Sequence, residues 1–177
     1  MIADLSVIGP QATIPRRIAA SSTRFYYGEP LIQAAASFTS GAASANVFTV
    51  AATDIGVIGT DNFGGIAIKE SLPLTTGTLV AQTTQAACPV GYLGRIRGVA
   101  ETVGNIDTEA ELLAIIQDAV LIDYDATGST SSGPSYTIKD TAAADTSAFQ
   151  IVAGNVTKGT LDVIMDPRFY RIGNTIA

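Results

Sequence analysis

The sequence contains no histidine among its 177 residues. Histidine is the commonest general base and the commonest ligand of transition metals, so its absence excludes Ser-His-Asp and Cys-His catalysis and histidine zinc sites. The one cysteine, Cys88, excludes an internal disulfide, and its small apolar neighbours predict a buried, inert thiol. We therefore expect a protein that is not an enzyme and that carries neither a metal nor a cofactor.

Charged residues are scarce, since 15% of the residues are Asp, Glu, Lys or Arg while 47% are hydrophobic. An average soluble domain has roughly 25% charged residues, so this surface must rely on Ser, Thr, Gly and Ala, and it suits contact with other proteins. The net charge of −6 argues against a nucleic-acid partner, which needs Lys and Arg concentrated over a large face.

Long apolar runs are also missing, and no stretch approaches the roughly 20 apolar residues of a membrane span. The opening residues lack the basic segment and the apolar core of a secretory signal. We therefore expect synthesis in the cytoplasm and no membrane association, and a length of 177 residues favours one compact domain.

The first 31 residues contain Pro10, Pro15 and Pro30 and show no helical apolar period, which predicts an extended N-terminal arm over 1–31 and a single β-rich domain over 32–177. Arginines and aromatic residues gather in this arm and near the C-terminus, with the chemistry of interface hot spots. The candidate contact residues are Arg16, Arg17, Arg24, Phe25, Tyr26 and Tyr27, with Arg168, Phe169 and Tyr170 as a second patch. A solvated, poorly packed terminus explains the first group equally well.

Short β-prone runs separated by Gly, Ser and Asn predict a mainly β fold, a small β-barrel or β-sandwich. The expected strands cover 46–50, 65–68, 78–81 and 94–99, and, further along the chain, 119–124, 136–139, 149–153 and 160–165. Arg95 and Arg97 flank Ile96, so they share one face of their strand. That face must be exposed or paired with carboxylates.

One packed α-helix is predicted, from Thr108 to about Ala119. Thr108 stands three residues before Glu111, which is the spacing of a capping box, and acidic residues in a first turn suit the helix dipole. The apolar stripe expected to face the sheet comprises Leu112, Leu113, Ile115 and Ile116.

No metal, phosphate or acid–base motif is complete. Residues 123–128 are similar to the start of a calcium-binding loop, but the twelfth position is Pro134, where a bidentate glutamate is needed. A strand that ends in a Gly, Ser and Thr loop over 125–135 is the better interpretation. Sixteen acidic residues leave open a hydrolase with two facing carboxylates, although such sites usually stand beside aromatic platforms and the sequence has no tryptophan.

Three β-prone segments carry a family resemblance: residues 94–100 (GRIRGVA), 119–125 (AVLIDYD) and 158–166 (KGTLDVIMD). Together they resemble the decoration, or cement, proteins of tailed-phage capsids. Proteins of that family are small, acidic, β-rich and poor in cysteine, and many bind as trimers across joints between capsid subunits. The resemblance therefore implies a homo-oligomer, such as a trimer, that binds a major capsid protein. The inserted helix departs from the simplest all-β members.

The resulting hypothesis is a structural virion protein that binds the outer surface of a phage capsid and stabilises it without a chemical step. Burial of contact surface across neighbouring capsomers would oppose outward genome pressure. Deleting residues 1–27 is expected to leave a folded domain that no longer binds. One alternative is a tail, baseplate or fibre component whose loop at 128–133 recognises a host surface, and the other is the carboxylate-based hydrolase.

Overall fold

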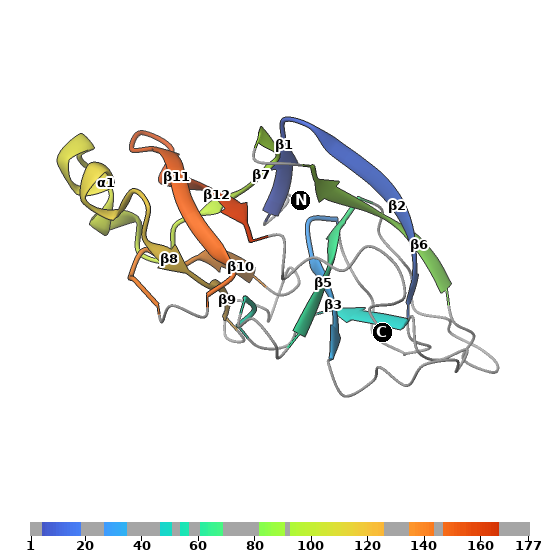
Figure 1. Cartoon of the computed structure of the whole chain (residues 1–177). Coiled ribbons are helices and arrows are strands. Elements are labelled where there is room, and N and C mark those ends of the chain that lie inside the picture. The colour runs from blue at the N-terminus through green and yellow to red at the C-terminus, as the bar shows by residue number, and fades with distance from the viewer. Residues whose placement is uncertain are drawn as a thin grey trace.

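The computed structural model describes residues 5–18, 27–34, 47–50, 54–56, 61–68, 82–90, 93–125, 135–143 and 147–166. Within these ranges the chain is mainly β, with antiparallel sheets and one α-helix, as Figure 1 shows. The predicted fold class is confirmed at this level.

One sheet has five antiparallel strands. Their order across the sheet is β1 (Leu5–Ile8), β7 (Arg95–Val99), β12 (Thr160–Met165), β11 (Phe149–Asn155) and β8 (Ala119–Val120). Side chains alternate between the two faces of a strand, so in β7 Ile96 is buried while Arg97 and Val99 are exposed on the outer face. The inner face of this sheet supplies much of the core.

A second group of strands pairs in a closed, barrel-like ring. The order around the ring is β2 (Gln11–Ile18), β4 (Val47–Val50), β3 (Pro30–Ala34), β5 (Asp61–Ala67) and β6 (Gln82–Pro89). Among the described pairs of this ring, β2 and β4 run parallel and the other pairs are antiparallel. The interior of the ring is tightly packed at Gly65, where a larger residue would not fit. A Cβ on Gly65 would lie 2.7 Å from Cys88 Sγ and 2.9 Å from Ala86 Cβ. Cys88 is buried there, as predicted.

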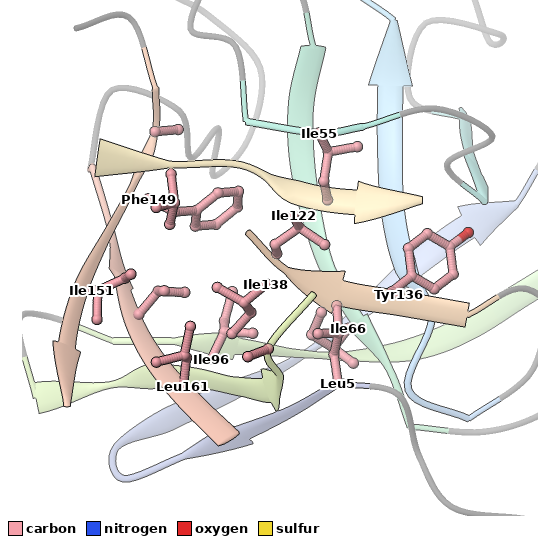
Figure 2. Close-up of a cluster of buried hydrophobic side chains, with 14 of the residues drawn as sticks. Leu5, Ile55, Ile66, Ile96, Ile122, Tyr136, Ile138, Phe149, Ile151 and Leu161 are labelled. Atoms are coloured by element: carbon pink, nitrogen blue, oxygen red, sulfur yellow. The ribbon is translucent and has the colours of Figure 1, made fainter. Parts of the chain in front are cut away.

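The hairpin of β9 (Ile122–Asp125) and β10 (Ser135–Ile138) covers the inner face of the five-stranded sheet. Ile55 exchanges two backbone hydrogen bonds with Ile122, which ties a segment preceding β5 to this hairpin. Figure 2 shows the shared core, where Ile96, Ile138 and Phe149 lie together. One continuous apolar cluster therefore joins the sheet, the hairpin and the near side of the ring.

The prediction of an extended N-terminal arm outside the β-rich domain is wrong for residues 5–18, which form β1 and β2 and pair with other strands of the fold. Leu5 is completely buried, and β2 pairs with β6 along its whole length. Proline is tolerated because Pro10 lies between the two strands and Pro15 lies where β2 pairs with β6 alone. Deleting residues 1–27 would remove two strands, so a folded truncated domain is no longer expected.

Helix α1 (Glu109–Ile115) follows a 3₁₀ turn, η3 (Val103–Asn105), and begins with the predicted capping box at Thr108. The helix ends before Ala119, because Gln117 adopts a φ of 79° and its N–H donates to the carbonyl of Ile151 in β11. Leu113 does not join the buried stripe and is exposed. A seven-residue helix buries only the narrow face that carries Leu112.

The strand predicted over 119–124 divides at Leu121 into β8 and β9. The sequence pattern did not predict four strands, β1, β2, β3 and β6. The other predicted strands over 46–50, 65–68, 94–99, 136–139, 149–153 and 160–165 coincide with β4, β5, β7, β10, β11 and β12 within a few residues. The predicted strand at 78–81 and the loop at 126–134 lie outside the described residues.

Candidate functional site

The structure describes three of the predicted contact residues. Arg16 and Arg17 lie within β2, where their backbones pair with Thr84 and Thr83 of β6. Tyr27 precedes β3, and its side chain is exposed. The remaining candidates, Arg24, Phe25, Tyr26, Arg168, Phe169 and Tyr170, lie outside the described residues.

A lysine bridges two carboxylates where the β9–β10 hairpin meets residues 54–56. Lys139 Nζ lies 2.9 Å from Asp54 Oδ2 and 3.1 Å from Asp123 Oδ1. Asp54 Oδ1 also accepts a hydrogen bond from the backbone N–H of Tyr124 at 3.1 Å. The three charged side chains thus come from the end of β10, from β9 and from the segment that pairs with β9.

The two carboxyl groups differ in pKa although they share one lysine. Partial burial raises the pKa of Asp54, but hydrogen bonds from Lys139 and Tyr124 outweigh burial and hold it below its ordinary value. Burial raises the pKa of Asp123 above its ordinary value, and its contact with Asp54 adds to the increase. Burial and the neighbouring charge of Asp123 likewise raise the pKa of Glu101.

This cluster supplies the two carboxylates that a hydrolase needs, but the ammonium group stands between them and bonds to both. A glycosidase pair requires one protonated acid and one free carboxylate on opposite sides of a bond. In this cluster each carboxylate instead ties one chain segment to another. Among the described residues no group of three or more Asp, Glu or Cys side chains is arranged to hold a metal ion.

Replacing Lys139 with methionine is expected to lower the free energy of unfolding at neutral pH by about 1–2 kcal/mol, a modest loss because Asp54 is 38% exposed and solvent screens the charges. The lowered pKa of Asp54 means that its contribution exists above the ordinary carboxyl pKa and is lost as the pH falls through the folded value. The raised pKa of Asp123 has the opposite effect, because its charged form disfavours folding. Protonation of Asp123 at low pH therefore removes part of the destabilisation of the Lys139→Met variant.

The difference in stability between the wild type and Lys139→Met should therefore shrink as the pH falls from about 7 to about 3. Urea unfolding at several pH values measures this difference. Lys158→Met, which removes an exposed lysine on the β11–β12 turn, is the matched control and should have little effect at any pH. A constant difference across the range would show that Lys139 acts through packing alone.

The outer face of the five-stranded sheet carries a second ion pair. Arg97 Nε lies 2.6 Å and Arg97 Nη2 lies 2.9 Å from the two carboxylate oxygens of Asp162, which is buried. Arg95 Nη1 approaches the same carboxylate at 3.9 Å. Of the two alternatives left open for this face, exposure or pairing with carboxylates, the structure shows the pairing, and Arg97 is exposed as well. The bidentate contact raises the pKa of Arg97 and joins β7 to β12.

Two groups of exposed aliphatic side chains were not predicted from the sequence pattern. Val90 and Leu93 lie beside the turn between β1 and β2, since Val90 N–H donates to the carbonyl of Pro10. Val99, Val103 and Leu113 lie in β7, η3 and α1. The stretch of chain that carries Val99, Val103 and Leu113 is unusual in the sequence too, because no lysine or arginine occurs between Arg97 and Lys139.

Within the described ranges no helix combines the length and the hydropathy that a membrane span needs. Comparison of the chain with protein-family models finds no match, and comparisons with curated proteins and with solved structures find none either.

Proposed function

We propose that this chain is a structural protein that binds the outside of a phage capsid and stabilises it mechanically. The observation that carries the proposal is the assembly of the three segments that resemble capsid decoration proteins. Residues 94–100 contain β7 and residues 158–166 contain β12, and these two strands pair directly. Residues 119–125 contain β8, which pairs with β11 beside β12. Two of the family-like segments thus supply adjacent strands of the five-stranded sheet, and the third supplies its edge strand β8, beyond β11, and continues into β9 of the hairpin that covers this sheet.

The described ion pairs suit a protein that acts by mechanical stabilisation. Arg97 and Asp162 join adjacent strands, and Lys139 joins the β9–β10 hairpin to Asp54. These contacts link segments far apart in the chain, so they resist separation of strands without taking part in a reaction. A protein that adds contact free energy between capsomers must itself stay folded, and these ion pairs contribute modestly to that.

The proposed contact with the capsid comprises the arginine and aromatic residues near the N-terminus, of which Tyr27 is exposed beside the ring. Because β1 and β2 belong to the fold, point substitutions are the appropriate test and truncation is not.

The double variant Arg24→Ala, Tyr27→Ala is expected to stay folded and to bind capsids that lack the protein at least about ten-fold more weakly. Co-sedimentation with purified particles measures the affinity, and circular dichroism confirms folding. Lys158→Ala, which removes one exposed cation elsewhere, should bind normally. Unchanged binding by the double variant would remove these residues from the contact.

The copy number in purified particles tests the proposal as a whole. A decoration protein should be present on the order of hundreds of copies over the capsid surface, whereas a tail, baseplate or fibre component should be present in few copies at one vertex. Quantitative mass spectrometry of particles gives the number directly. Few copies at the tail would replace the proposal with the tail interpretation.

A further inference from the structure

The negative charge of the protein is concentrated in one stretch of chain. Between Arg97 and Lys139 there are seven Asp or Glu residues and no Lys or Arg, whereas the whole chain has a net charge of −6. In the described part of the chain, the carboxylate residues with exposed positions all lie in this stretch, at Glu101, Asp107, Glu109 and Glu111. The remainder of the protein is therefore close to electrical neutrality.

Exposed aliphatic side chains lie among these carboxylates. Val103 packs against the β11–β12 turn, since a Cβ on Gly159 would lie 2.6 Å from it, and Val99 is paired with Thr160 beside the same turn. Leu112 of α1 lies against Gly154 near the end of β11, which places α1 along this hairpin as well. Leu113, the next residue, is 70% exposed. Figure 1 shows α1 and this hairpin at the end of the molecule away from the ring.

The backbone beneath this surface is firmly held. Ile106 is completely buried between η3 and α1, and the capping box at Thr108 satisfies the first turn of the helix. The carbonyl of Gly159 accepts a hydrogen bond from Ala100 N–H at 2.9 Å. A partner would not have to order these segments, so binding would lose little conformational entropy.

We propose that this end of the molecule, residues 99–114 with the β11–β12 turn at 156–159, is a docking surface for a basic, amphipathic segment of another protein. The exposed carboxylates would attract lysine or arginine, and Val103 and Leu113 would bury apolar side chains of the same segment. Nucleic acids and anionic membranes carry the wrong charge. An isologous contact with a second copy would bring the same carboxylates face to face. Lys158 is the one cation on the turn.

A synthetic amphipathic helix of about 14 residues, built from lysine and leucine, serves as the probe. Its binding to the ¹⁵N-labelled full chain, followed by NMR, should shift the amide signals of residues 99–117 and 154–160. Leu113→Ser should weaken binding by about five-fold or more, whereas Leu93→Ser, which alters a side chain of equal exposure (71%) beside the β1–β2 turn, should leave it within about two-fold. Neutralising Asp107 and Glu109 together, as Asp107→Asn and Glu109→Gln, should weaken binding at about 50 mM salt and have little effect at about 300 mM.

Three results would overturn the proposal. The first is either amide NMR shifts that spread over the ring, or equal losses of peptide binding in Leu113→Ser and Leu93→Ser. Either result would indicate non-specific binding. Another is equally tight binding of a matching peptide with glutamate in place of lysine. The third is a dimer of the free protein in sedimentation that Leu113→Ser dissociates, since the surface would then be covered by a second copy. None of these readouts depends on capsid binding, so the docking surface can fail while the proposed function stands.

Discussion

Replacing Phe149 with alanine is expected to lower the free energy of unfolding by about 3–5 kcal/mol, the largest loss we expect from a single substitution. Phe149 is 1% exposed, and its ring meets Phe63 of β5 edge-on, with centroids 6.1 Å apart and planes at 86°. Gly56 lies directly against the same ring. The substitution therefore opens a cavity where the five-stranded sheet, the ring and the segment at 54–56 meet.

Urea unfolding followed by both near-ultraviolet and far-ultraviolet circular dichroism measures the effect. Both signals should change at the same urea concentration, because one core joins the sheet to the ring. The adjacent Gln150→Ala, whose side chain is exposed, should lose less than about 1 kcal/mol and is the matched control. Two separate transitions in the wild type would contradict a single core.

Replacing Gly94 with alanine is expected to cost about 3 kcal/mol, because the added methyl group would meet only backbone atoms. It would lie 2.6 Å from the carbonyl oxygen of Pro10 and would also clash with the amide nitrogen of Val90. These two groups form a hydrogen bond of 2.9 Å with each other. The chain passes between the five-stranded sheet and the ring at this point twice, from β1 to β2 and from β6 to β7.

Gly104→Ala provides the comparison, since nothing lies within 4 Å of the position that its Cβ would take. The unfolding free energy of that variant should change by less than about 1 kcal/mol in either direction. Urea unfolding of both variants under the same conditions gives the difference. Equal midpoints for Gly94→Ala and Gly104→Ala would mean that the two connections can separate without loss.

Local patterns in the sequence predicted the elements that depend on neighbouring residues. The capping box at Thr108 needs only residues 108–111, and it is present in the structure. The strand at 160–165 follows from a β-prone run, and its bounds agree with β12. The shared face of Arg95 and Arg97 followed from alternation along one strand, whereas their pairing with Asp162 was only one of two alternatives until the structure showed it.

The N-terminal strands and Leu113 show what local sequence patterns could not predict. Prolines suggested an arm, yet Pro10 and Pro15 occupy places that sheets tolerate, so β1 and β2 were missed. The sequence pattern placed Leu113 on the buried apolar stripe of the helix. In the structure the hydrogen bond from Gln117 N–H to the carbonyl of Ile151 limits the length of α1, and Leu113 is exposed to solvent. The acidic stretch was readable from the sequence, whereas its grouping with exposed aliphatic side chains was not.

The sequence by itself determined the chemistry of this protein: no histidine, one cysteine, scarce charge, and acidic residues gathered between Arg97 and Lys139. Short-range periodicity also determined most of the strands and the start of the helix. The tertiary structure alone decided which strands pair, which carboxylates share Lys139 and which apolar side chains remain exposed. The reason is physical, because Arg97 and Asp162 are 65 residues apart and meet only when long-range β pairing has brought β7 beside β12.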